Sequence, residues 1–294
     1  MEKAVYHLPG LFEFYDFYRK FLPIYREKTE YFYDWCQIGS LYGAPADCLW
    51  GGGRVGFGDA DPGQVLALTE EYGLSARLTF SNSLLRPEHL KDPKCNRLCA
   101  LFGAEPGNGV IVHSELLLDY LKEKYPNFYF VSSTTKVLTD FEDLAAETER
   151  PDFRYVVPDF RLNKTFDRLA GLKEKRKVEF LCNECCWPGC RERKECYENV
   201  SRKNLGEHCP DHICAAPEGE KGYRFSAAMK NPAFIGIRDI RETYLPMGFS
   251  QFKIEGRGLG SAMLLEFILY YLTKPEYQLP LREEMYLDSM LDLF

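Results

Sequence analysis

Short apolar runs alternate with amphipathic segments along most of this chain. The runs predict strands at 4–8, 32–41, 76–80, 109–112, 128–132, 154–157, 178–181 and 251–254. Segments with apolar positions at helical spacing lie between most of them, at 11–22, 62–72, 115–125, 140–149, 163–172 and 261–272, with a further helix around Cys95 and Cys99. Pro23 is predicted to end the first helix. This alternation implies a parallel sheet that is buried on both faces.

Eight strand–helix units predict an α/β fold of the (β/α)8 TIM-barrel type. An open doubly wound sheet gives the same alternation and is the second possibility. The barrel is favoured because most strands end in polar residues, which would meet on one face. We expect a single barrel over 1–274, including a Cys-rich loop at 182–250 between strands 7 and 8. The tail, 275–294, is expected to pack on the barrel or on a partner chain.

Composition and charge limit the classes of function that this protein can have. The 294 residues are 45% hydrophobic and carry a net charge of −7, which is typical of a globular protein and argues against non-specific binding to a phosphate backbone. The N-terminus has no apolar signal segment, and the longest apolar stretch, 262–272, is too short to span a bilayer. We therefore expect a cytoplasmic protein without membrane insertion.

Cysteines crowd one segment of the expected loop. Seven of the 11 cysteines lie between Cys182 and Cys214, directly after a predicted strand. In a cytoplasmic protein this density indicates a metal or redox centre rather than disulfides. The predicted metal ligands are Cys186, Cys190, Cys209 and Cys214.

The choice of ligands leaves several alternatives. Cys186 and Cys190 flank a Pro-Gly turn that would bring their sulfurs together, and Cys209 is the third choice. The fourth position is open between Cys214 and Cys48, which lies beside a Gly-rich loop. Cys182 and Cys185 form a rival ligand pair. Separately, His208 and His212 leave open a mixed Cys/His zinc site.

Charged side chains at the strand ends are the candidate catalytic groups. Glu255 and Arg257 follow the last predicted strand, and Arg54 follows the Gly-rich loop. A guanidinium there could bind a carboxylate or phosphate, and Glu255 could move protons; a structural ion pair at the barrel rim is the alternative. Further strand-end residues are predicted to bind substrate, namely His7, Asn82, His113, Lys136, Asp159 and Asn183.

Two stretches resemble a known family. The sequence F-K-I-E-G-R at 252–257 looks like a signature of the peptidase family U32 (collagenase-like protease) proteins, and 178–186 resembles that family's strand and cysteine region. The resemblance implies a barrel fold. Several members are oxygen-independent hydroxylases of RNA or small molecules that carry a four-cysteine [4Fe–4S] cluster, so the resemblance also implies such a cluster. This chain is shorter than the better-known members of the family, and its cysteines after the seventh strand are closer together than theirs. The resemblance therefore does not indicate the substrate.

The leading hypothesis is an iron–sulfur barrel enzyme that hydroxylates, or otherwise modifies by redox chemistry, a small molecule or RNA. A protein partner chain is also possible. A U32-type peptidase is the first alternative, although the sequence has no His-Glu-x-x-His or Gly-x-Ser-x-Gly motif. The second is a non-catalytic or binding protein in which zinc replaces the cluster and only holds the loop.

Overall fold

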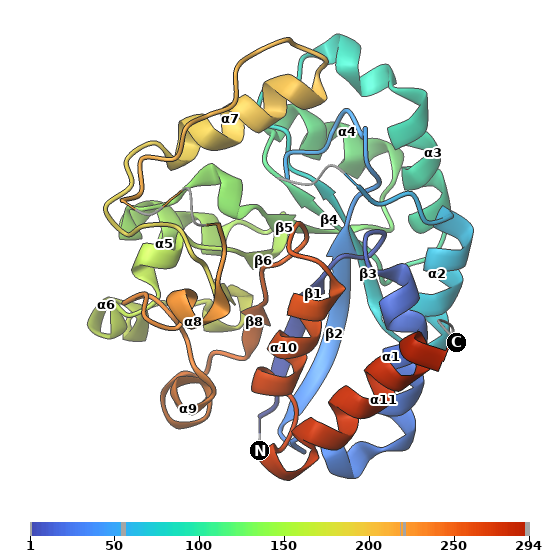
Figure 1. Ribbon diagram of the computed structural model, residues 1–294. Coiled ribbons are helices and arrows are strands. Elements are labelled where there is room, and N and C mark those ends of the chain that lie inside the picture. Colours follow the sequence, from blue (N-terminus) through green and yellow to red (C-terminus); the bar gives the residue numbers. More distant parts are fainter. Residues whose placement is uncertain (1, 54–56, 218, 220–221, 292–294) are drawn as a thin grey trace.

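The strands form one parallel sheet that curves into a barrel (Figure 1). The computed structural model describes residues 2–53, 57–217, 219 and 222–291. The strand order is β6-β5-β4-β3-β2-β1-β8-β7, and a parallel bridge between Val156 and Val178 joins the two remaining edges. The predicted (β/α)8 barrel is therefore confirmed. The strands are β1 (Ala4–Pro9), β2 (Cys36–Gly43), β3 (Ser75–Phe80), β4 (Gly109–Val112), β5 (Tyr129–Ser132), β6 (Phe153–Val156), β7 (Glu179–Leu181) and β8 (Gln251–Lys253).

Helices cover the outside of the barrel, and most begin at a capping side chain. Asp61, Asp92 and Ser114 each accept a hydrogen bond from a backbone N–H in the first turn of the helix that follows. These helices are α1 (Tyr15–Glu27), α2 (Pro62–Glu71), α3 (Pro93–Phe102), α4 (Glu115–Lys124), α5 (Phe141–Glu149), α6 (Phe166–Ala170) and α10 (Ser261–Tyr271).

The expectation that Pro23 ends the first helix is wrong. Helix α1 continues past this proline to Glu27. A proline inside a helix leaves the carbonyl one turn earlier without its N–H partner. That carbonyl belongs to Arg19, which is exposed, so water can satisfy it.

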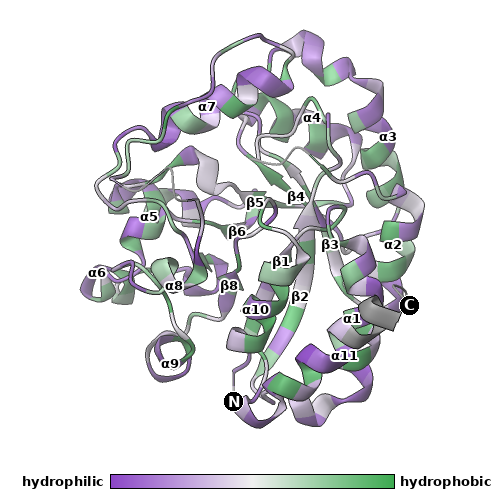
Figure 2. Ribbon diagram, in the orientation of Figure 1, coloured by the Kyte–Doolittle hydropathy of each residue, from purple (hydrophilic) through white to green (hydrophobic). Residues whose placement is uncertain are grey.

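The barrel wall separates an outer apolar layer from a mixed interior. On β3, the side chains of Ala76, Leu78 and Phe80 belong to the core between sheet and helices, while Arg77 and Thr79 point into the barrel. Figure 2 shows the apolar colouring concentrated along the strands and the inner helix faces. A small apolar cluster occupies the upper interior and consists of Tyr42, Ile111, Val131, Val157 and Leu181.

The Cys-rich insertion between β7 and β8 is largely helical or irregular. It contains α7 (Arg193–Asn204), α8 (Phe225–Ala228), α9 (Ile237–Asp239) and a π-helical turn, η7 (Ile240–Tyr244). Helix α7 lies over the C-terminal ends of the strands (Figure 1), where Ser201 accepts a hydrogen bond from the backbone N–H of Ser83. The insertion therefore covers the face on which barrel enzymes build their sites.

The C-terminal tail packs against the barrel's own helices. Helix α11 (Gln278–Leu291) places Arg282 in a bidentate contact with Glu266 of α10. Glu284 pairs with Lys28 at 2.6 Å, just after α1. Within the described ranges, none of the helices has the length and apolar character needed to cross a membrane.

Candidate functional site

A cavity of about 950 Å³ opens at the C-terminal ends of the strands. Strand residues line its lower part, including Tyr42 from β2, Thr79 from β3 and Lys253 from β8. The loops after β5 and β7 and the Cys-rich insertion line its upper part. Parallel strands point their C-terminal ends at one face, so side chains far apart in the sequence meet here.

Lys253 is the buried cation of the cavity floor. Its Nζ atom lies 3.2 Å from Oε1 of Glu179 and 3.6 Å from the centroid of the Tyr42 ring. Burial lowers the pKa of Lys253 to about 8, although Glu179 opposes the shift. An amine with this pKa can gain or lose a proton near neutral pH.

Below Lys253, a charged group fills the interior of the barrel. Arg77 donates to Oε2 of Glu179 at 2.5 Å, and the guanidinium lies over the ring of Tyr155. Burial alone would raise the pKa of Glu179, but Arg77, His7 and Lys253 outweigh it and hold that pKa below its usual range. Glu179 thus stays ionised and supports the cations around it.

Three hydroxyl groups line the cavity together with the thiols. Thr79 and Ser81 are buried, and neither side-chain oxygen has a hydrogen-bond partner among the described residues. Thr134, in the turn after β5, likewise has a buried and unpartnered hydroxyl within that part of the chain. All three line the cavity. Because an unsatisfied buried hydroxyl is costly, these groups are well placed to bond a polar ligand.

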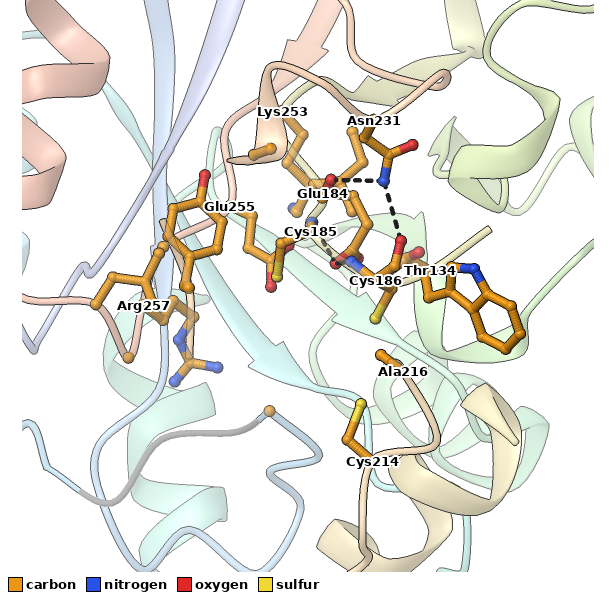
Figure 3. Close-up of a pocket in the computed structure, with 18 of the residues that line it drawn as sticks. Thr134, Glu184, Cys185, Cys186, Cys214, Ala216, Asn231, Lys253, Glu255 and Arg257 are labelled. Carbon is orange, nitrogen blue, oxygen red and sulfur yellow. Dashed lines mark hydrogen bonds between the residues drawn. The ribbon is translucent and has the colours of Figure 1, made fainter. Parts of the chain in front are cut away.

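Glu255 and Arg257 both line the cavity, as Figure 3 shows. Arg257 also pairs with Glu13 at 2.6 Å and donates to the carbonyl of Ala44 at 3.2 Å. Arg257 therefore takes part in an ion pair at the barrel rim, with a partner, Glu13, that the sequence did not identify. Arg54 lies outside the described residues.

Asn183 ties the ends of β7 and β8 together. Its side-chain oxygen accepts from the backbone N–H of Glu255 at 2.7 Å, and its Nδ2 donates to the carbonyl of Glu255 at 3.1 Å. Both partners are backbone atoms, so Asn183 holds Glu255 at the cavity and does not itself line it.

Two of the four predicted metal ligands line the cavity. Cys186 and Cys214 point toward one another across it in Figure 3, with Cys185 beside them. Cys190 lies further along the turn, where its carbonyl accepts from Arg161 at 2.8 Å. Cys209 lies near the side chain of Asn199, 3.6 Å from Nδ2. The structure thus brings two predicted ligands to the site and leaves two on the same insertion.

The thiols are not assembled as a finished metal centre. In the described part of the chain, no three His, Cys, Asp or Glu side chains are grouped as a metal ion requires. Cys48 is buried 3.7 Å from Cys95, on the helix side of the barrel. Cys182 is buried as well, and His212 lies 3.3 Å from Glu192. Cys48, Cys182 and His212 do not line the cavity, whereas the alternative ligand Cys185 does.

The other predicted substrate-binding residues lie away from the cavity, each with partners of its own. His7 points into the lower barrel, where it contacts Ser40 at 2.8 Å and Gln251 at 3.0 Å. It lines a second cavity of about 500 Å³ at the N-terminal ends of the strands. Alternation along β1 places the His7 side chain inside the barrel. It faces the cavity at the N-terminal ends of the strands and not the candidate site.

The remaining predicted substrate-binding residues make local contacts, and they are Asn82, His113, Lys136 and Asp159. Asn82 donates to the carbonyl of Ser201 at 3.1 Å, which holds α7 on the barrel. His113 bonds Thr135 at 2.9 Å, and burial followed by Lys136 lowers its pKa to about 4. Lys136 pairs with Glu147 at 2.7 Å. Asp159 is buried and accepts from Arg161 at 2.6 Å.

The sequence interpretation missed the charged residues inside the strands. Glu179 begins β7, Lys253 ends β8 and Arg77 lies within β3, and each of them interrupts a run of apolar residues. A charge at such a position is the signal that could have found them, because strand alternation points it into the barrel.

Comparison with known proteins supports the fold. No protein-family model matches the chain, and no curated protein matches it. Two solved chains match in structure. One is the structure of the U32 peptidase Mk0906, with a TM-score of 0.56 and 15% sequence identity over 88% of this chain and 94% of that chain. The chain therefore has a U32-like barrel fold, and a likeness at this identity extends to the fold alone.

Proposed function

We propose that this protein is an enzyme that modifies a small molecule or RNA in the cavity at the strand ends, by oxygen-independent hydroxylation or a related redox reaction that uses an iron–sulfur cluster. One observation carries the proposal. The accessible thiols of Cys185, Cys186 and Cys214 line the same cavity as Lys253 and Glu255. Thiols beside titratable groups in a concave site are typical of a reaction centre.

The donor set fits a cluster in part. Cys186, Cys190, Cys209 and Cys214 would hold it, and two of them already face the cavity. The segments that carry Cys190 and Cys209 would have to approach the cavity for all four to bind. A bound cluster would supply electron transfer.

The chain's own residues would prepare the substrate. Thr79 and Ser81 offer unpaired hydroxyls, and Lys253 offers a buried ammonium group for a polar or anionic part of it. Glu255, held by Asn183, would accept or give a proton at the cavity wall. The apolar floor that includes Ile111 would keep water from entering through the barrel.

Anaerobic purification with iron, sulfide and zinc analysis tests the cofactor. We expect a coloured protein with stoichiometric iron and sulfide. Cys186→Ser and Cys214→Ser should each lose most of the iron. Cys196→Ser is the matched control, because Cys196 lies on the same insertion but is not among the four proposed ligands. A colourless protein with stoichiometric zinc would overturn the proposal.

A peptidase is the second candidate, suggested by the printed name of the structurally similar protein. The described residues that line the cavity include cysteines and serines but no histidine, so a Cys–His or Ser–His pair is not preformed there. Cleavage of casein or collagen peptides by the metal-free protein, with loss in Cys186→Ser, would favour the peptidase over the redox enzyme.

A further inference from the structure

A single carboxylate holds the turn that carries the cavity thiols. Oε1 of Glu184 accepts hydrogen bonds from the backbone N–H groups of both Cys185 and Cys186, each at 3.0 Å. Oε2 of the same side chain accepts from Nη2 of Arg193 at 2.6 Å. Figure 3 shows Glu184 next to the two cysteines. Successive backbone N–H groups that converge on one point form an anion-binding concavity, and here the chain's own Glu184 fills it.

Arg193 is buried deeply enough to make this contact strong. Its side chain is 1% exposed and lies between the rings of Phe160 and Tyr197, with centroid distances of 4.9 and 5.2 Å. Its Nε lies 3.4 Å from Asp159. A buried guanidinium is costly without a carboxylate partner, so it fixes the position of Glu184.

The far side of the turn is held by the same network. Asp159 pairs with Arg161 as well as Arg193, and Arg161 donates to the carbonyl of Cys190 at 2.8 Å. Nδ2 of Asn231 donates to the carbonyl of Cys186 at 3.0 Å. The backbone from Cys185 to Cys190 is therefore anchored at both ends by side chains that come from the segment after β6, from α7 and from the loop after α8.

We propose that Glu184 and Arg193 are positioning residues, which fix the thiol-bearing turn at the cavity whether or not a cofactor is bound. The use of these thiols by a cofactor rests on the proposed function; the anchoring of the turn does not. Neither residue needs to touch the substrate. Glu184 acts through the backbone N–H groups of Cys185 and Cys186, and Arg193 acts through Glu184.

Hydrogen exchange on the full-length, metal-free protein tests the anchoring. Loss of Glu184 alone would leave Arg193 buried without its partner and risks unfolding. We therefore compare two double variants. One combines Glu184→Gln with Arg193→Met, and the other combines Glu184→Ala with Arg193→Met. Both lack the two charges, and only the first keeps a side-chain oxygen for the two amides.

We expect peptides that span 184–190 to exchange at least fivefold faster in the alanine double variant than in the glutamine one, with peptides from β1–β4 unchanged. Equal exchange of 184–190 in the two variants would overturn the anchoring. Faster exchange throughout the alanine variant would also overturn it, because Glu184 would then support the whole fold rather than this turn.

Iron retention after anaerobic reconstitution supplies the second readout. The alanine double variant should hold several-fold less iron than the glutamine one. Equal retention, together with a difference in exchange, would show that the turn is anchored but that the cofactor does not depend on the anchor. Absence of iron from the wild-type protein would refute the proposed function and leave the exchange result to decide the anchoring.

Discussion

The ammonium group of Lys253 lies 3.2 Å from Oε1 of Glu179, inside the barrel and at the floor of the candidate site. Glu179 also binds Arg77, so one carboxylate serves two buried cations. Glu179→Gln should destabilise the protein by about 3 kcal/mol or more, because it leaves both cations without an ionised partner. Urea unfolding at pH 7 measures the change.

Lys253→Met is the companion variant. Methionine keeps the length of the side chain and removes a charge whose burial is unfavourable, while Glu179 keeps Arg77. We expect a loss of less than about 1.5 kcal/mol. A larger loss than that of Glu179→Gln would contradict the view that Glu179 organises this group.

Stability should fall as the pH drops below about 6.5, partly because of His7. Burial and Arg77 lower the pKa of His7 from 6.5 to about 3. Between these values the unfolded chain binds one more proton than the folded chain, so the folded state loses about 1.4 kcal/mol per pH unit from this group. The lowered pKa of Glu179 acts in the same direction at still lower pH.

His7→Gln isolates that contribution. Unfolding free energies at pH 7, 6 and 5 should fall less steeply for the variant than for the wild-type protein, because glutamine does not titrate. Parallel curves for the two proteins would show that His7 is not held neutral in the folded state.

The rim ion pair between Glu13 and Arg257 should matter more than a surface pair. The side chains of Glu13 and Arg257 are 0% and 11% exposed. Glu13→Gln should cost about 3 kcal/mol, because Arg257 loses its partner in a mostly dry position. Arg26→Gln is the control, since its pair with Glu71 is about half exposed and is worth less than about 1 kcal/mol. Similar losses of unfolding free energy in Glu13→Gln and Arg26→Gln, measured by thermal or urea unfolding, would refute the distinction between the two pairs.

Gly52 should tolerate no side chain. A Cβ at this position would overlap the backbone of Ser81 at the end of β3. Gly52→Ala should therefore cost about 2 kcal/mol, as overpacking does in a tight contact. Gly171→Ala is the matched control, because the nearest atom to its added Cβ is 3.4 Å away, and we expect a change of less than about 1 kcal/mol. Equal unfolding free energies for the two variants would contradict the close approach.

The sequence by itself determined the barrel and the face that holds the site. Short apolar strands that alternate with amphipathic helices have few other ways to bury both sides of a parallel sheet. The strand-end rule also placed Glu255 and Arg257 on that face, and both line the cavity.

Only the tertiary structure decided which polar side chains face that cavity and which partners they take. Asp159 and Asn82 follow strands as Glu255 does, yet they bind Arg193 and the backbone of α7 instead. Glu179 meets Arg77 across 102 residues, because closure of the barrel brings β7 and β3 to face one another. Sequence patterns report local periodicity, whereas the choice of partner depends on how the closed sheet staggers its strands and on where a long insertion comes to rest.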